Sequence, residues 1–182
     1  MAANGIAMLA ITEKTMLEPV SRSAYREAMR LTASGVSIVA TDGSAGRGGL
    51  TVSTLQSLSL DPPSIMLCIQ ANSPNMNLLR KNRVFIANML ASGQHAIAGL
   101  FAGGAIPDRD MHFDGPHWRT VTSGTPGLVG APCVFDCVLA NVFSYAPHRV
   151  VVGEAKGIEI GQAEPLIYVD RTYRHLHDEV GK

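Results

Sequence analysis

Short extended segments dominate this chain and limit the folds it can adopt. Apolar or alternating residues form about seven strand-like runs, at 36–41, 49–60, 65–70, 84–90, 133–143, 149–160 and 166–169. The helical patterns are few and short, and they do not alternate regularly with the strands as in a doubly wound fold. The pattern predicts a mainly β fold, a closed or split β-barrel with flanking helices.

One domain is expected. The 182 residues, 46% of them hydrophobic, suffice for a single core, and no linker or repeat divides them. The predicted boundaries are an N-terminal arm at 1–20, a barrel domain at 21–176 and a C-terminal tail at 177–182.

Capping signals mark three helices. The candidate caps are Ser23, Ser73 and Ser92, and Ser73 is followed by Pro74, a residue favoured in the first helical turn. A segment rich in Gly and Pro follows the third helix at 103–130. Long loops of this kind in compact domains are usually functional or mobile.

The charge balance excludes some partners. Fifteen basic residues match fifteen acidic ones, so no net field attracts nucleic acid or an anionic membrane surface. No apolar run approaches the about 20 residues that cross a bilayer. A net charge near zero also permits self-association, which makes a homo-oligomer plausible.

The three cysteines, Cys68, Cys133 and Cys137, have no disulfide-framework spacing, and a cytoplasmic location is expected. Cys133 and Cys137 could suggest a thiol pair, but they fall on a predicted strand. Residues four apart on a strand are separated by roughly 13 Å, which favours a structural role.

Several familiar sites are missing from the sequence. We find no zinc-protease motif, nucleophile elbow or phosphate-loop lysine, and the six histidines lack metal-ligand spacing, so no metal is predicted. The glycine-rich 46–49 segment precedes a strand, which favours a hairpin over a dinucleotide loop.

Hydroxyl residues recur with a period of two in the run at 49–60. On one continuous strand, Thr51, Ser53, Ser57 and Ser59 would share a face. Such a row can bind a polar ligand or, with backbone N–H groups, a phosphate. From the chemistry alone, the alternative of a solvated strand face stays open.

From about Tyr25 to Leu176 the sequence resembles the flavin reductase family. The resemblance is carried by Gly35-Val36, by the segments at 50–55, 57–63 and 85–90, by Asp108-Arg109 and by Gly153-Glu154. It implies a flavin-binding split barrel of Greek-key type, with FMN or FAD as flavin and NADH or NADPH as co-substrate. It further implies a homodimer that supplies reduced flavin to a separate monooxygenase.

The same resemblance implies a set of cofactor-binding residues. Thr51, Val52, Ser53 and Thr54 would follow the flavin ring and ribityl chain, Ser57 and Ser59 its phosphate end, and Asp61 and Pro62 the adjoining turn. Leu55 belongs to the same cofactor-binding set. Ser73 and Asn77 are further phosphate candidates because helix N-termini favour anions, although simple capping is an equal alternative. No catalytic side chain is expected, since hydride passes between the two cofactors.

The sequence departs from the family pattern on the nicotinamide side. Ala146-Pro147-His148 stands where Gly-Asp-His is expected, and Asp110 replaces an aromatic residue after Arg109. His148 and Arg109 are the candidate nicotinamide contacts. Two alternatives therefore stay open, a non-catalytic flavin-binding module and an oxidase-like enzyme with tightly held flavin. The choices of FMN or FAD, of NADH or NADPH, and of oxygenase are undecided.

Overall fold

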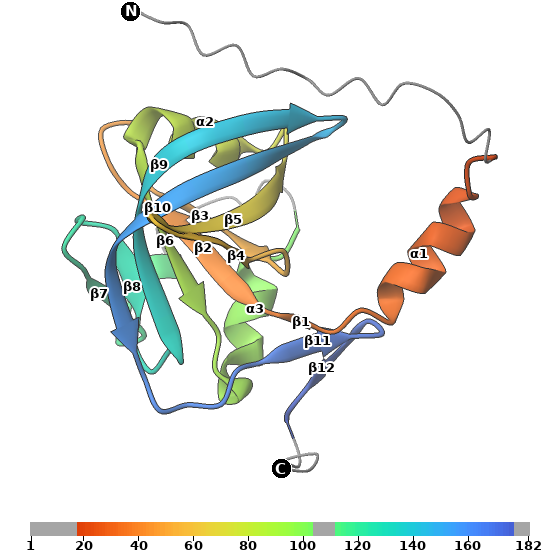
Figure 1. Cartoon of the computed structure of the whole chain (residues 1–182). Coiled ribbons are helices and arrows are strands. Elements are labelled where there is room, and N and C mark those ends of the chain that lie inside the picture. The colour runs from red at the N-terminus through yellow and green to blue at the C-terminus, as the bar shows by residue number, and fades with distance from the viewer. Residues whose placement is uncertain (1–17, 104–111, 177–182) are drawn as a thin grey trace, which may run out of the picture.

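The computed structural model describes residues 18–103 and 112–176. Within these ranges lie the helices α1 (Arg22–Arg30), α2 (Pro74–Asn82) and α3 (His95–Phe101), and a 3-10 turn, η1 (Ser92–Gln94), directly before α3. The strands are β1 (Ser34–Gly35), β2 (Ser37–Thr41), β3 (Gly48–Val52), β4 (Gln56–Leu60), β5 (Pro63–Gln70), β6 (Val84–Met89), β7 (Trp118–Thr120), β8 (Pro126–Leu128), β9 (Cys133–Tyr145), β10 (His148–Ile160), β11 (Ile167–Val169) and β12 (Thr172–Arg174). The mainly β fold predicted from the sequence is confirmed (Figure 1). Most of the predicted arm at 1–20 and the whole predicted tail lie outside the described residues.

A seven-stranded antiparallel sheet forms the body, in the order β3-β2-β6-β9-β10-β5-β4. The strands β3 and β4 follow each other in the chain but lie at opposite edges. The link between them, 53–55, is tied to β5 by Thr54, whose hydroxyl accepts from the Cys68 N–H at 2.9 Å and donates to the Cys68 carbonyl at 3.3 Å. The sheet therefore curls until its first edge strand lies beside β5.

The prediction of one continuous strand at 49–60 was wrong. The strand is interrupted at 53–55, and the alternation that would have put Thr51, Ser53, Ser57 and Ser59 on one face is lost. The bonds between Thr54 and Cys68 override the local strand pattern, since they connect residues 14 positions apart.

The central strands are buried on both faces and separate two cores. In β2, Ile38 and Ala40 belong to a cluster with Phe101 of α3, while Val39 belongs to the barrel interior with Met76 of α2. This two-sided burial explains the continuous apolar runs in the sequence. It also places α2 and α3 against different faces of the sheet.

Part of the segment at 103–130, expected as a long excursion, forms the β7–β8 hairpin. Asn88, fully buried on β6, holds this hairpin: its Oδ1 accepts from the Leu128 N–H at 2.7 Å, and its Nδ2 donates to the Pro126 carbonyl at 3.4 Å. A second small sheet, β1-β11-β12, lies beside the barrel.

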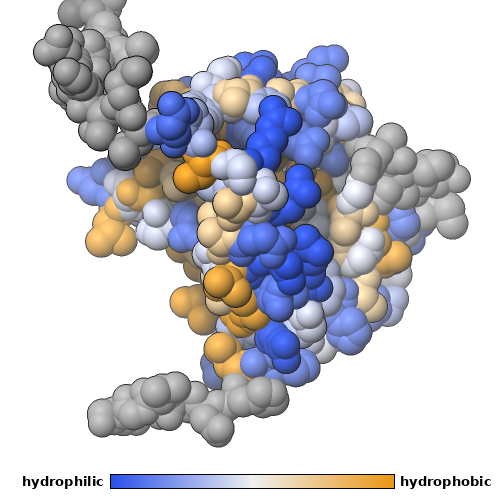
Figure 2. All heavy atoms as spheres, turned by 90° about the vertical axis from the view of Figure 1, so that its right-hand side faces the viewer, coloured by the Kyte–Doolittle hydropathy of each residue, from blue (hydrophilic) through white to orange (hydrophobic). Residues whose placement is uncertain are grey.

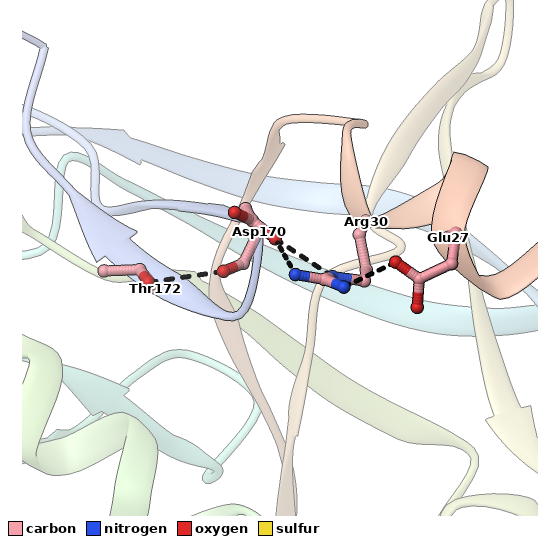
Figure 3. A network of polar contacts seen from close by, with 4 residues as sticks. All are labelled: Glu27, Arg30, Asp170 and Thr172. Atoms are coloured by element: carbon pink, nitrogen blue, oxygen red, sulfur yellow. Dashed lines mark hydrogen bonds and ion pairs between the residues drawn. The ribbon is translucent and has the colours of Figure 1, made fainter.

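The N-cap of helix α1 lies two residues earlier than predicted. Ser21, not Ser23, is the N-cap, and its hydroxyl accepts from the Ala24 N–H at 3.1 Å. At its other end Arg30 donates through Nε to Asp170 Oδ1 at 2.9 Å (Figure 3). The pKa of Arg30 is raised, first by the hydrogen bond to Asp170 and then by the charges of Asp170 and Glu27.

In the described ranges no helix has the length and apolar character needed to span a bilayer.

Two glycines of β10 provide a test of the barrel packing. A Cβ on Gly153 would lie 2.2 Å from Cζ of the fully buried Phe85, whereas a Cβ on Gly157 would meet nothing closer than the Asp136 Cβ at 3.4 Å. We expect Gly153→Ala to lower the free energy of unfolding by about 1–3 kcal/mol, because the core cannot accept the added methyl group. Gly157→Ala, the matched control, should change it by less than about 1 kcal/mol. Urea denaturation followed by circular dichroism measures both, and equal losses would contradict the packing described.

Candidate functional site

An open cleft of about 650 Å³ lies where five parts of the chain meet. Its walls come from the end of β3 with the 53–55 link, the end of β5, the start of α2, the end of α3 and the start of β10. The lining residues are Leu50, Thr51, Val52, Ser53, Thr54, Cys68, Ile69, Gln70, Asn72, Ser73, Pro74, Asn75, Phe101, Gly103 and His148. The cleft brings together six of the residues predicted from the sequence: Thr51, Val52, Ser53, Thr54, Ser73 and His148.

The hydroxyl residues of the cleft are held in different ways. Thr51 donates to the Ala98 carbonyl of α3 at 2.7 Å, and Thr54 is bonded to the backbone of Cys68. Ser53 lies between these two fixed points, is exposed, and has no hydrogen-bond partner among the described residues. Ser53 is therefore the hydroxyl that is available to a ligand.

The start of α2 forms the polar end of the cleft. Ser73 is its N-cap, but the Ser73 side chain makes no capping hydrogen bond, so this hydroxyl also remains available. Asn75 is buried and donates to the Gly49 carbonyl at 2.9 Å. The exposed backbone N–H groups of a first helical turn favour an anion.

The structure does not bring Asn77 into the cleft. Asn75 lines the cleft while Asn77 is exposed elsewhere on α2. Residues two apart on a helix are about 200° apart around its axis, so they cannot share a face. The sequence analysis missed Asn75, because the contact that buries it, with the Gly49 carbonyl of β3, joins residues 26 positions apart and leaves no local signal.

Two glycines let the helices approach β3. A Cβ on Gly49 would lie 2.8 Å from Phe113 Cζ and 3.0 Å from Phe101 Cε1, and one on Gly48 would lie 2.6 Å from Asn75 Oδ1. The glycine-rich segment is thus part of the β2–β3 hairpin, as predicted, and its glycines permit close packing behind the cleft.

Three further predicted residues lie in a different hollow. Leu55, Ser57 and Ser59 line a space of about 340 Å³ at the β4 edge, whose walls are mainly apolar. The Ser59 hydroxyl is also engaged in the adjoining turn, since it donates to the Asp61 carbonyl at 2.9 Å and accepts from the Asp61 N–H at 3.0 Å. Placing Ser57 and Ser59 beside Ser53 was wrong, because the 53–55 link separates them.

Asp61 and Pro62 form the β4–β5 turn through a cis peptide bond. They shape the turn, as predicted, but neither residue lines the cleft or the second hollow. Their assignment to a cofactor site stays a prediction.

His148 lies at the mouth of the cleft, at the start of β10. The preceding turn is fixed to the end of β5 because the Pro147 carbonyl accepts from the Ala71 N–H at 2.8 Å. The other nicotinamide candidate, Arg109, lies outside the described residues, as do Asp108 and Asp110.

Among the described residues, those that line the cleft include no carboxylate, lysine or arginine. Cys68 contributes a half-buried thiol to its wall, while burial, with a smaller effect of Asp136, raises the pKa of Cys137 to about 12. Burial also raises the pKa of Cys133.

Within the described ranges no group of three or more His, Cys, Asp or Glu residues is placed to hold a metal ion. The described part of the cleft can therefore bind and orient a ligand, and its side chains form no acid–base pair.

Comparison with known proteins shows what this chain is similar to. Residues 29–177 match the family model described as Flavin reductase like domain. FMN reductase (NADH) RutF 2 of Methylorubrum extorquens (strain PA1) is 39% identical over 160 residues, covering 87% of this chain and 92% of the relative. FMN reductase (NADH) RutF of Variovorax paradoxus (strain S110) is 37% identical over 153 residues, covering 84% of each.

Solved structures share the fold. A putative flavin reductase from Haemophilus somnus 129pt is 30% identical with a TM-score of 0.80, covering 86% of this chain and all of its own. BorF, the flavin reductase component of a bacterial two-component tryptophan halogenase, is 27% identical with a TM-score of 0.81, covering 87% of this chain and all of its own. The split-barrel fold predicted from the sequence is confirmed.

Two serines test which hollow holds the flavin expected from the sequence. We expect Ser53→Leu to weaken flavin binding at least about tenfold, because a bulky side chain enters the cleft where a free hydroxyl stood. Ser57→Leu, an equal change in the second hollow, should leave the affinity nearly constant. Flavin fluorescence quenching gives the affinities and thermal melting checks the fold. A loss confined to Ser57→Leu would move the site to the β4 edge.

Proposed function

The chain belongs to the flavin reductase family, and on that premise we propose that it is an NADH-dependent FMN reductase that supplies reduced flavin to a separate monooxygenase. The choice of FMN and NADH is supported by the names of the two curated relatives, which specify both. The choice of a separate oxygen-using partner is supported by BorF, a reductase component of a two-component system.

The observation that carries this proposal is a cleft whose described lining residues are uncharged hydrogen-bonding and apolar groups, with a helix N-terminus at one end. When both are bound, the flavin and the nicotinamide supply the chemistry themselves, as hydride passes from nicotinamide C4 to flavin N5. The protein has only to position the two rings, so the lack of an acid–base pair among the lining residues is no obstacle.

Each group in the cleft then has a positioning role. The fixed backbone around Thr51 and Thr54 forms a rigid wall along the flavin, and the free hydroxyl of Ser53 bonds the polar part of the ligand. Ser73 and the first N–H groups of α2 bind the phosphate, where the partial positive charge of the helix end is greatest. His148 faces the side from which the nicotinamide enters.

The direct test is aerobic oxidation of NADH and NADPH by the purified protein, with FMN and with FAD. We expect the fastest turnover with NADH and FMN, with flavin that exchanges freely. No turnover with any of the four pairings would refute the reductase function. Tightly held flavin without NADH consumption would instead favour the non-catalytic module or the oxidase-like enzyme.

We propose a homodimer in the cytoplasm as the working form. The balanced charges of the chain support self-association, and three unpaired thiols are typical of a reducing compartment. The reductase domain is placed at 21–176, a range that the family match at 29–177 supports.

His148→Ala should raise the Michaelis constant for NADH severalfold or lower turnover, while the affinity for FMN stays nearly constant. An imidazole hydrogen bond to the carboxamide or a phosphate oxygen contributes roughly 1–3 kcal/mol when the acceptor is charged. The control is His117→Ala, which changes an exposed histidine that does not line the cleft. Steady-state kinetics and fluorescence quenching separate the two cofactors, and an equal loss of both would point to the fold or the flavin site instead.

A further inference from the structure

The mouth of the cleft adjoins a further hollow that lies between two turns. This outer hollow, of about 370 Å³, is lined by Gln70, Ala71, Asn72, Pro147 and His148. Three of these residues, Gln70, Asn72 and His148, also line the cleft, so the two spaces are neighbours. The outer hollow has no role in the function proposed above.

Backbone hydrogen bonds hold the outer hollow in shape. The Ser73 N–H donates to the Gln70 carbonyl at 3.0 Å and closes the turn between β5 and α2. The Ala71 N–H donates to the Pro147 carbonyl at 2.8 Å, and His148 is paired with Gln70 in the register of β10 and β5. The two turns are therefore joined, and a ligand that binds between them meets a surface that needs little rearrangement.

The polar side chains of the outer hollow match the edge of an adenine ring. Gln70 and Asn72 are exposed, and their side-chain amides have no hydrogen-bond partner among the described residues. A side-chain amide donates through its NH₂ group and accepts through its oxygen, a pattern that pairs with N6 and N7 of adenine. The hollow therefore favours a neutral ring that offers both donors and acceptors.

An exposed aromatic ring stands beside this hollow. Tyr145, the last residue of β9, is 78% exposed and lies directly opposite His148 in the β9–β10 register. Directly opposite residues of antiparallel strands point to the same face of the sheet, with Cβ atoms roughly 5 Å apart. Since Gln70 lies opposite His148 on β5, the three side chains form one row across three strands.

The surroundings of this row suit a nucleotide, which has a flat apolar ring and polar edges. The β9–β10 turn projects beyond the barrel (Figure 1), and the side of the molecule toward which it points mixes hydrophilic and hydrophobic residues (Figure 2). A tyrosine ring can stack on a base while its hydroxyl stays in water.

The proposed chemistry leaves half of the co-substrate outside the cleft. The cleft, at about 650 Å³, is of the size that holds one drug-sized ligand, and flavin with nicotinamide on its ring takes up this space. We propose that the outer hollow binds the adenylate half of a dinucleotide, with adenine stacked on Tyr145 and hydrogen-bonded by Gln70 and Asn72. His148, which lines both spaces, lies where the linking pyrophosphate passes.

NADH and FAD both carry an adenylate group, and NADH is its source in the function proposed above, on which this inference rests. Tyr145→Ala should raise the Michaelis constant for NADH at least about fivefold with kcat unchanged, because base–aromatic stacking is lost. Reduced nicotinamide mononucleotide has the same reacting ring but no adenylate, so its Michaelis constant should not change. Tyr145→Phe keeps the ring and should keep the constant for NADH within about twofold. Steady-state kinetics at saturating FMN measure all of these.

Phe143→Ala is the matched control. Phe143 is another exposed aromatic residue on the same face of β9, but it lies opposite Val150, one pair further from the hollow, and its loss should change neither constant. In Tyr145→Ala, an equal rise for NADH and for the mononucleotide would overturn the proposal, and so would no rise for either unless FAD binding alone is weakened. Weaker binding of FAD with FMN unaffected would keep the adenylate site and assign it to the flavin.

Binding of AMP separates this inference from the reductase function. Calorimetric titration of AMP into FMN-saturated protein should show binding that Tyr145→Ala weakens at least about fivefold, whether or not NADH is oxidised. A protein that binds AMP in this way but oxidises no NADH would refute only the reductase function. A protein that oxidises NADH, with AMP binding and the Michaelis constant for NADH both indifferent to Tyr145, would refute only the adenylate site.

Discussion

The two hydrogen bonds between Thr54 and the backbone of Cys68 hold the chain where it crosses from one edge of the sheet to the other. Since β3 and β4 are consecutive in sequence yet lie at opposite edges, this crossing determines whether the sheet curls into a barrel. The same crossing forms a wall of the cleft and leaves Ser53 exposed between two anchored residues. Closure of the barrel and formation of the binding site are therefore one structural event.

The cleft also explains how a flavin reductase can lack the usual catalytic groups. The lining residues that the structure describes include hydroxyls, amides, a thiol and an imidazole, but no carboxylate or fixed positive charge. The N-terminus of α2 provides a partial positive charge for a phosphate without a lysine or arginine, whose strong field would hold the ligand more tightly. A described lining without charged side chains suits a flavin that must leave after it is reduced.

The sequence predicts the parts of this fold that depend on local patterns. The long strands β9 and β10 follow from apolar runs, and α2 follows from Ser73-Pro74. The interruption at 53–55 could not be predicted, because the period of two continues through these residues and the contact that breaks it lies 14 positions away. Ser57 and Ser59 therefore line a different hollow from Ser53, and Asn75 lines the cleft where Asn77 was expected. The short strands β7 and β8 were missed because their support comes from the buried side chain of Asn88 on β6.

The unusual Ala146-Pro147 pair keeps His148 at the cleft. Ala146 has a φ of 48°, in the left-handed region where a glycine would be free of strain, so an alanine there is unfavourable by about 1–2 kcal/mol. Pro147 restricts the next φ by its ring, and its carbonyl accepts from Ala71 of the adjoining segment. The pairing of His148 with Gln70 then fixes the first residue of β10 against the end of β5. The contacts of the turn with the end of β5 therefore fix where His148 lies, although Ala146 and Pro147 depart from the pattern expected of the family.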